Sequence, residues 1–418
     1  MQILLKNVTI LDPQSPFHSS SQDILIQEGI IREISPSISA IKGVKTVSFK
    51  NLHVSRGWFD PSVSFGEPGY EERETLSNGA AVAAKSGFTK ILLNSNTDPV
   101  PDSASAIGNL VQMTATLPIA LHPIGALTVG SKGEQMASLY DMHSSGAIAF
   151  GDHKISIDKG NLLKIALQYC QSFNGRVISF PQNKELSVGG LMHEGVSSTK
   201  IGMKGIPSMA ESVQISRDIE ILKYTGGKLH IPYLSTADGL ELIRSAKRLG
   251  LELSCSVGLP HLVFEDRELE SFDPNFKIFP PIRTKSDQQA LRAGLLDGTI
   301  DMVTSMHEPM NIEHKKIEFE NAAPGSLGLE SCFGMLNKVF PLDHVINFLT
   351  RGAKHFDIPC PIVNIGEKAD LCLFDPDVSV HFTQDDVKST SKNSAYIGHD
   401  HQGKVLGTIY NGNLITNE

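Results

Sequence analysis

The sequence predicts an α/β fold in which a (β/α)8 barrel is joined to a small β domain. Two observations support this. Short apolar runs alternate with helical stretches from about residue 56 to residue 360, and strands of alternating apolar and polar residues occur at both ends of the chain. With 418 residues the chain is long enough for both parts. We expect residues 1–55 and 361–418 to form the β domain and residues 56–360 to form the barrel.

The N-terminal strands are expected first along the chain. Apolar and polar residues alternate in three segments around a Glu-Gly turn, and the same pattern returns near the C-terminus around Gly and Asn turns. The segments are 2–11, 23–34 and 45–49 at one end, and 369–376, 403–412 and 413–416 at the other. Because the two ends share this pattern, we expect them to pair in one small β-sandwich domain.

The central region contains candidates for buried barrel strands. The apolar runs are 90–94, 119–127, 147–150, 176–180, 228–234, 251–257 and 300–304. Between them, apolar residues recur at three- and four-residue spacing in segments that include 74–87, 161–173, 211–226 and 236–250. In a (β/α)8 barrel the chemistry lies at the carboxyl ends of the strands, so the residues that close each apolar run are the candidates for function.

Composition excludes several classes of function. The chain is 40% hydrophobic and 20% charged, as in ordinary globular proteins, and its net charge of −9 offers no basic face for nucleic acid. The N-terminus reads as a strand and not as a signal peptide, and no stretch is expected to cross a membrane. The five cysteines show no C-x-x-C spacing, which favours reduced thiols. We expect a cytoplasmic protein.

Several segments together carry a more specific pattern. They are GWFDPSVSFGEPGYEERETLSNGAAVAAKSGFT, NSNTDPVPD, KIGMKGIPSMAESVQISRDIEIL, KLHIPYLSTADGLELIRSAKRLG, KIFPPIRTKSDQQALRAGLLDGTIDMV, GSLGLE, EKADLCLFDP and KNSAYIGHDHQGKVLGTIYNG. In order and spacing, over essentially the whole chain, they resemble the dihydroorotase branch (type I) of the cyclic amidohydrolases. The resemblance implies an amidohydrolase-type (β/α)8 barrel, zinc as the metal, and hydrolysis of dihydroorotate to N-carbamoyl-aspartate in pyrimidine biosynthesis.

The first motif of that family is changed at its functional positions. The family has Asp-x-His-x-His-Leu-Arg-Glu-Pro-Gly, in which two histidines bind zinc and the arginine binds the substrate carboxylate. This chain has Ser62 and Ser64 at the histidine positions and Gly66 at the arginine position. A neutral hydroxyl is a poor zinc ligand beside imidazole, thiolate or carboxylate. The resemblance therefore implies that the motif is present but that two of the zinc ligands are missing.

The remaining metal positions are also altered, with one exception. Asp152, in Ala-Phe-Gly-Asp, is the one family ligand that is retained. Phe180 stands where the family has the histidine of Val-Ile-Ser-His, and Tyr233 stands at the second histidine of His-Ile-x-His. A phenyl ring cannot coordinate zinc, and a neutral phenol is a weak ligand.

The positions for proton transfer and substrate binding follow the same trend. Met306 occupies the position of the aspartate that serves as general base, and a thioether cannot accept a proton at neutral pH. Met310 and Phe279 replace a histidine and an asparagine that hold substrate. Asn96 alone survives from the substrate-binding set. Without an activated water, the cyclic amide would have no nucleophile.

Other readings of these residues remain open. Asp152 and His153 are either the remnant of a metal site or, more simply, a loop cap. His230, His261 and His307 fit local hydrogen bonding, and a new metal site would need several ligands converging without any ordered spacing. Nucleophilic catalysis by Ser62 or Ser64 would need a partnered base, and no Gly-x-Ser-x-Gly elbow surrounds them.

We therefore expect a non-catalytic dihydroorotase homologue with no cofactor of its own. In some bacteria inactive homologues of this kind scaffold aspartate carbamoyltransferase, which makes that enzyme the first candidate partner by analogy. Homo-oligomers are common among the relatives, and we expect one here. An active cyclic amidohydrolase with atypical metal ligands is one alternative. A protein that binds a small molecule at the apolar barrel mouth is another.

Overall fold

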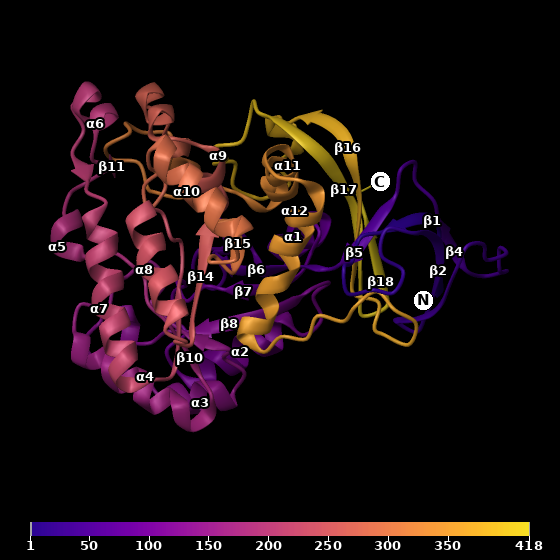
Figure 1. The fold of residues 1–418 in the computed structure, drawn as a ribbon, viewed down its shortest axis with the longest axis horizontal. Helices are drawn as coiled ribbons and strands as arrows, with labels where there is room; N and C mark the ends of the chain where they lie inside the picture. The colour runs from indigo at the N-terminus through magenta and orange to yellow at the C-terminus, as the bar shows by residue number, and fades with distance from the viewer. Residues whose placement is uncertain (1, 418) are drawn as a thin grey trace.

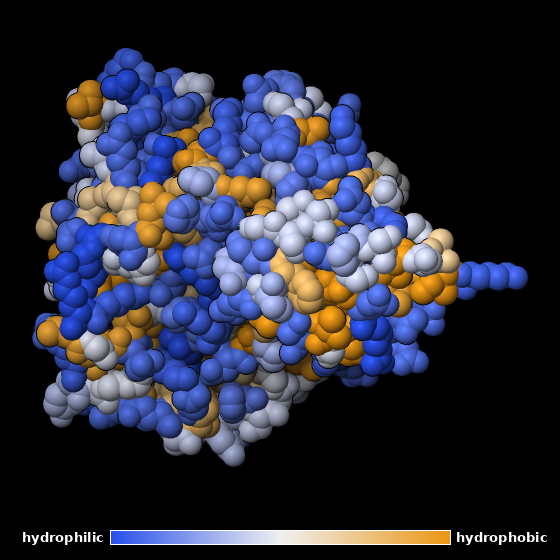
Figure 2. All heavy atoms as spheres, turned by 45° about the vertical axis from the view of Figure 1, so that its right-hand side comes forward, coloured by the Kyte–Doolittle hydropathy of each residue, from blue (hydrophilic) through white to orange (hydrophobic). Residues whose placement is uncertain are grey.

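A computed structural model describes residues 2–417 of the chain. Figure 1 shows a barrel wrapped in helices on the left and a β-sheet on the right, with both chain termini on the side of the sheet. Among the described residues, no helix is long and apolar enough to cross a membrane. On the face drawn in Figure 2, hydrophilic residues predominate, and hydrophobic residues lie among them.

The barrel is a nearly closed, eight-stranded parallel sheet. In spatial order its strands are β6 (Trp58–Val63), β7 (Phe88–Leu93), β8 (Ala120–Gly125), β9 (Ala149–Phe150), β10 (Arg176–Ile178), β13 (Lys228–Ile231), β14 (Leu253–Gly258) and β15 (Met302–Thr304). Closure between β15 and β6 involves the backbone N–H of Ser64, which donates to the carbonyl of His307 at 2.9 Å. The predicted (β/α)8 barrel is confirmed, and each predicted apolar run falls on one of these strands.

Helices cover the outside of the barrel. They are α1 (Leu76–Lys85), α2 (Ala104–Thr114), α3 (Leu139–Ser144), α4 (Gly160–Cys170), α5 (Lys184–Ser187), α6 (Val196–Ile201), α7 (Met209–Thr225), α8 (Ala237–Arg248), α9 (Leu259–Val263), α10 (Lys285–Leu296), α11 (Leu329–Val339) and α12 (Leu342–Thr350). Side-chain caps set several of their starts: Thr75 accepts from the N–H of Asn78, and Thr236 accepts from that of Gly239, both at 3.1 Å. The helical segments expected from apolar spacing correspond to α1, α4, α7 and α8.

The two ends of the chain form a second, separate sheet. Its strand order is β18-β17-β16-β5-β1-β2-β3, and β4 also pairs with β1. The bounds are β1 (Gln2–Ile10), β2 (Ser21–Gln27), β3 (Ile30–Ser35), β4 (Lys45–Val47), β5 (His53–Arg56), β16 (Leu371–His381), β17 (Asp400–Tyr410) and β18 (Asn413–Thr416). Antiparallel pairing of β5 with β16 joins the termini, with Leu371 opposite Arg56. The boundaries at residues 55 and 360 remain a prediction.

Each of the two sheets has its own apolar core. Inside the barrel, Phe356 and Ile358 pack against a cluster of side chains from neighbouring strands, which comprises Phe59, Leu92, Ile124, Ala149, Ile178 and Met302. The terminal sheet curls around a separate cluster of Ile, Leu and Val side chains. Its curvature brings its two turns together, since a Cβ on Gly29 would lie 3.2 Å from the backbone nitrogen of Gly412.

A buried polar network holds the carboxyl end of β13 against its neighbours. Glu211 of α7 accepts hydrogen bonds from the backbone N–H of Ser235 and of Thr236, and from both of their hydroxyls. The Arg283 side chain donates to the Ser235 hydroxyl at 3.2 Å and to the carbonyl of Ile206 at 2.8 Å. These hydrogen bonds hold the loop after β13 in one position.

The remaining connections contain one strand pair and several short turns. A two-stranded pair, β11 (Met192–His193) with β12 (Gly205–Ile206), flanks α6 outside the barrel. Short 3-10 turns are η1 (Val129–Ser131), η2 (Gln171–Phe173), η3 (Asp266–Ser271), η4 (Pro274–Phe276), η5 (Ile312–His314), η6 (Arg351–Phe356) and η7 (Gln384–Asp386). The carboxyl ends of the barrel strands therefore meet at one mouth, where the residues expected to matter lie.

Candidate functional site

Asp60 links the first and last barrel strands. Its Oδ1 accepts from the Thr304 hydroxyl at 2.7 Å and from the Ser62 N–H at 3.1 Å, and its Oδ2 accepts from the Ser305 N–H at 2.9 Å. Burial raises the pKa of the Asp60 carboxyl, and the hydrogen bonds from Ser305 and Thr304 oppose that rise. With both oxygens engaged by the scaffold, Asp60 stabilises the closure of the barrel.

Ser62 and Ser64 are connected through a third polar residue, Asn94, at the end of β7. The Ser62 hydroxyl donates to Asn94 Oδ1 at 2.7 Å, and Asn94 Nδ2 donates to the Ser64 hydroxyl at 2.9 Å. Ser62 Oγ also hydrogen-bonds the hydroxyl of Tyr233. All four side chains are buried. Burial raises the pKa of the Tyr233 phenol, so it is neutral at physiological pH.

Asp152 follows β9 and is hydrogen-bonded to Thr128. Its Oδ1 accepts from the backbone N–H of Thr128 at 3.0 Å, and its Oδ2 accepts from the Thr128 hydroxyl at 2.5 Å. The side chain is 3% exposed, and burial raises the pKa of the carboxyl. The carboxylate therefore anchors the loop after β8.

Aromatic side chains pack across the centre of the mouth. The Phe180 ring lies 5.3 Å from the ring of Phe279 and 6.2 Å from that of Tyr233, between centroids. Phe180 is 1% exposed and Tyr233 is 2% exposed. Such contacts between rings stabilise the packed state beyond simple burial.

Very little space remains beneath these rings. The cavity at the mouth is lined by Ser62, Asn94, His153, His230 and Tyr233, together with apolar residues from the strand ends. Measured to the centre of a water-sized sphere, its volume is about 10 Å³. That is about enough for one water molecule, whereas pockets for organic ligands span roughly 300–1,000 Å³.

A buried charge cluster covers one side of the mouth. Glu308 receives hydrogen bonds from the ammonium of Lys154 and from Nε2 of His153, the latter at 3.5 Å. Burial raises the pKa of Glu308, but the charge of Lys154 and the contact with His153 outweigh it and bring that pKa to about 2. The Lys154 ammonium also lies 5.5 Å from the centroid of the Tyr233 ring. Opposite charges thus neutralise one another within the site.

The segment after β15 places a thioether at the mouth. Met306 is 4% exposed, and a Cβ on Gly258 would lie 1.9 Å from its sulfur, so this glycine makes room for it. The Nδ1 of His307 accepts weakly from the N–H groups of Gly328 and Leu329, both at 3.4 Å. Burial lowers the pKa of His307 to about 3, which keeps the imidazole neutral.

His230 faces the barrel interior from β13. Its Nδ1 lies 2.9 Å from the hydroxyl of Ser254, and its Nε2 lies 3.2 Å from that of Ser256. Burial lowers the pKa of His230 well below its usual value, and nearby Arg176 acts in the same direction. Both ring nitrogens are therefore used by β14, which leaves neither free for a ligand.

Gly66, Met310 and Asn96 stand at the positions where the resemblance implies contacts with substrate. Gly66 is wedged against the next loop, since a Cβ there would lie 1.7 Å from the carbonyl oxygen of Tyr70. Met310 is 9% exposed, and its N–H donates to Asn393 Oδ1 at 3.0 Å. Asn96 is half-buried, and its Oδ1 has no hydrogen-bond partner within residues 2–417.

Comparison with known proteins decides the family. The family model described as dihydro-orotase-like matches residues 54–239. A dihydroorotase from Pelotomaculum thermopropionicum is 34% identical over 422 residues, covering 99% of this chain and 98% of that protein. A dihydroorotase from Carboxydothermus hydrogenoformans is 33% identical, over 99% of this chain and 97% of that one. This chain belongs to the dihydroorotase family.

Solved structures share the fold of this dihydroorotase-family chain. An L-hydantoinase (dihydropyrimidinase) from Arthrobacter aurescens superposes with a TM-score of 0.86 at 21% identity, over 99% of this chain and 96% of that one. A dihydropyrimidinase from Brevibacillus agri NCHU1002 gives 0.84 at 19% identity, covering 100% of this chain and 95% of that one. These likenesses establish the barrel and the adjoining sheet.

The zinc of the dihydroorotase family does not fit the residues present. At the positions that the resemblance assigns to zinc ligands, the hydroxyls of Ser62, Ser64 and Tyr233 are neutral and hydrogen-bonded, and Phe180 has no donor atom. Asp152 offers a carboxylate, but both its oxygens are bonded to Thr128. Within the described part of the chain, no three His, Cys, Asp or Glu side chains are grouped so that they could hold a metal ion.

Sequence reasoning missed three members of this dihydroorotase-like site. Asn94 organises the two serines, Asp60 joins β6 to β15, and Lys154 neutralises Glu308. Asn94 and Lys154 each lie within two residues of positions that were singled out, so their place just past a strand end was an available signal. The sequence held no signal for the pairing of Lys154 with Glu308, because 154 residues separate them.

Proposed function

We propose that this dihydroorotase-family protein does not hydrolyse dihydroorotate and is retained for assembly. The observation that carries the proposal is that Ser62, Ser64 and Tyr233, at three positions that the resemblance assigns to metal ligands, are hydrogen-bonded to one another directly or through Asn94. Neutral hydroxyls that already bond one another cannot replace imidazoles around a cation.

The packing at the mouth supports the same proposal. Phe180, Phe279 and Met306 present apolar surface where a charged, hydrophilic ring would have to bind. A cavity of about 10 Å³ would have to expand more than tenfold to hold such a ring. Expansion would expose aromatic surface that is now buried, and each Å² exposed to water would cost about 25 cal/mol of free energy. The same argument weighs against the alternative of a small molecule bound at this mouth.

The role in assembly is proposed by analogy within the family. Inactive homologues in some bacteria scaffold aspartate carbamoyltransferase, the preceding enzyme of pyrimidine biosynthesis, and we propose that enzyme as partner here. We also propose that the chain forms a homo-oligomer. Light scattering after size exclusion, with this chain alone and with the carbamoyltransferase of the same organism, would measure both. Two separately eluting species, each with the mass of one component measured alone, would contradict the partnership.

The decisive experiment measures zinc content and activity together. Purified protein is incubated with zinc, freed of excess metal and assayed for hydrolysis of dihydroorotate, with the Pelotomaculum thermopropionicum relative as positive control. We expect less than about 0.1 zinc per chain, because a site without strong ligands retains little metal, and no turnover above buffer.

A second candidate is an active dihydroorotase with atypical ligands, and the names of the relatives favour it. Chains 30–34% identical to this one over 97–100% of their length carry the name dihydroorotase. Near-stoichiometric zinc together with turnover would establish this candidate and contradict our proposal. Turnover without bound metal would also contradict it, because the site would then use a mechanism outside the family's chemistry.

A further inference from the structure

A long stretch of the chain carries no charged side chain. Residues 103–131 contain no Asp, Glu, Lys or Arg, although these residues make up 20% of the sequence. The stretch includes α2, which lies on the outside of the barrel and exposes Asn109, Gln112 and Met113. Charged residues are normally most frequent at such exposed positions. Burial in the core therefore does not explain why α2 has none.

Exposed apolar side chains of α3 and α4 adjoin α2. Helix α2 packs against α3, and Val111 of α2 reaches the loop after α3, since a Cβ on Gly146 would lie 2.9 Å from it. Phe173, just after α4, lies 5.6 Å from Tyr140 of α3 and 5.8 Å from Tyr169 of α4, between ring centroids. In Figure 1, α3 and α4 lie at the lower left, away from the terminal sheet. We call this surface the α2–α4 face; its large hydrophobic side chains, 37–52% exposed, are Val111, Met113, Tyr140, Ile165 and Tyr169. Contiguous apolar surface of this kind marks sites where proteins bind one another.

The polar groups of the α2–α4 face suit a contact with the same face of another copy. Over the bounds of α2, α3 and α4 the charged residues are Asp141 and Lys164, whose opposite signs cancel. Gln112 of α2 and Gln168 of α4 are exposed, and neither amide is hydrogen-bonded to another side chain in the described part of the chain. An amide both donates and accepts, so the same residue in two copies can pair with itself. The face is thus self-complementary in its polar groups.

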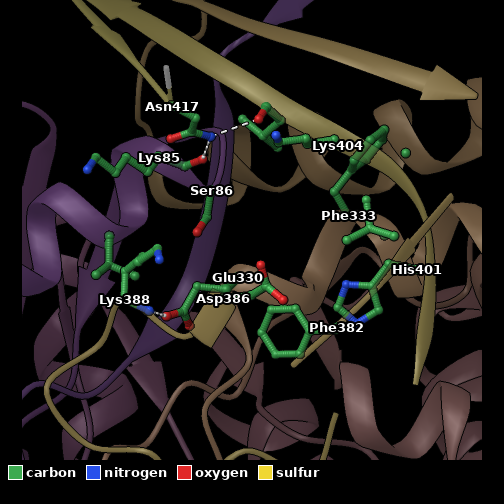
Figure 3. Close-up of a pocket in the computed structure, with 15 residues that line it drawn as sticks. Lys85, Ser86, Glu330, Phe333, Phe382, Asp386, Lys388, His401, Lys404 and Asn417 are labelled. Carbon is green, nitrogen blue, oxygen red and sulfur yellow. Dashed lines mark hydrogen bonds between the residues drawn. The ribbon is translucent and has the colours of Figure 1, made fainter. Parts of the chain in front are cut away.

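The net charge of the chain explains why an uncharged face suits a second copy. Each copy carries −9, so two copies repel one another. A two-fold dimer brings the same patch of both copies together, which places like charges near one another wherever that patch is charged. The cavity of about 370 Å³ between the barrel and the terminal sheet is such a charged region; along its walls lie Lys85, Glu330, Asp386, Lys388 and Lys404 (Figure 3). The α2–α4 face avoids this cost, whereas a partner of different sequence is typically matched by opposite charge.

We propose that a second copy of this chain binds the α2–α4 face and forms a dimer with two-fold symmetry. The inference rests on the homo-oligomer proposed above and names its surface. Tyr140 and Tyr169, which pack around Phe173, supply rigid aromatic contacts, and such side chains carry much of the binding energy of interfaces. The depletion of charge on α2 matches the composition found at the buried centre of interfaces.

Sedimentation velocity of the full chain measures the dissociation constant of the dimer. Met113→Glu and Ile165→Glu each place a charge on the face, and each should weaken dimerisation at least about 100-fold, because every dimer then buries two like charges. The matched control is Val378→Glu, which adds the same charge at a residue 40% exposed on β16 and should leave the dissociation constant unchanged. Emission of the buried Trp58 verifies that each variant is folded.

The dependence on salt is a second measurement. Between about 50 and about 500 mM NaCl the dissociation constant should fall, since salt screens the repulsion between the two acidic copies. A contact held by ion pairs would weaken instead, because salt screens those pairs as well. A dissociation constant that rises more than about threefold over this range would contradict an uncharged contact.

The outcomes separate this dimer from the function proposed above. A wild-type chain that stays monomeric at about 100 µM would overturn the dimer together with the homo-oligomer, and would leave the absence of dihydroorotate hydrolysis untouched. A dimer that persists in either folded glutamate variant would overturn the α2–α4 face alone. Glutamate variants that lose the carbamoyltransferase but keep their self-association would show that the face binds another protein, and would overturn the proposal of a second copy.

Discussion

Replacing Glu308 by glutamine should destabilise the fold through the charge cluster at the barrel mouth. The glutamine keeps the shape of the side chain but removes the charge that faces Lys154 and His153. Both Glu308 and Lys154 are about nine-tenths buried, with side-chain exposures of 10% and 12%. A charge left without its partner in such a place costs stability, because neither water nor a counterion replaces the lost contact.

The size of the effect follows from the pKa of Glu308. That pKa falls from 4.5 to about 2 in the folded state. At 1.36 kcal/mol per pKa unit, folding stabilises the ionised form of Glu308 relative to its protonated form by roughly 3 kcal/mol. Because the folded-state pKa is depressed, this contribution is fully present above about pH 4.5, the unfolded value, and is lost as the pH falls toward 2. The variant should therefore lose roughly 3 kcal/mol at pH 7 and much less near pH 2.

Urea denaturation followed by fluorescence measures this loss. Trp58 is the one tryptophan of the chain and is fully buried, so its emission reports unfolding. The matched control is Glu313→Gln, at an exposed glutamate in the same loop, which should change little. The double variant Glu308→Gln with Lys154→Met should cost less than the sum of the two single changes. A loss below about 1 kcal/mol at pH 7, or additive single effects, would refute the reasoning.

Three further predictions concern packing and metal. Phe180→Ala should cost about 3–5 kcal/mol by opening a cavity among the aromatic rings, measured by the same urea assay; a loss under 1 kcal/mol would show that the ring is not packed. Gly66→Ala should cost about 1–3 kcal/mol because its Cβ meets the Tyr70 carbonyl oxygen, while Gly108→Ala, with open space around it, should cost nothing. Zinc and EDTA should each leave the melting temperature unchanged in scanning calorimetry; a rise with zinc would reveal a site that binds it.

Much of the fold could be predicted because local pattern and tertiary position agree. The run 228–234 is mainly apolar before the chain turns polar, and β13 occupies its first four residues, of which 229–231 are buried on both faces of the strand. Thr75 and Thr236 signal helix starts through a bond that spans three residues, so no distant partner is needed. The alternation of apolar and polar residues at the two ends of the chain predicted a sheet. It did not predict that β5 and β16 would be the strands that pair the two ends.

The site was harder to predict because its bonds connect distant segments. Ser62, Asn94 and Tyr233 come from three strands, and their contact depends on barrel register, which no short pattern encodes. Family resemblance showed which positions had changed, but not that the new residues bond one another. The room for Met306 beside Gly258 depends on a backbone path that only the folded chain defines.

The junction of β5 with β16 also has a consequence for biosynthesis. Strands β1 to β5 leave the ribosome first, yet the strand that completes their sheet begins only at Leu371. At translation rates of about 5–20 residues per second, roughly 300 residues separate the two events by some 15–60 seconds. During that interval the edge of β5 and the apolar face of the first strands have no partner, and unpaired edges of this kind favour aggregation. Chaperone dependence should therefore concentrate in the N-terminal strands, before synthesis of the chain is complete.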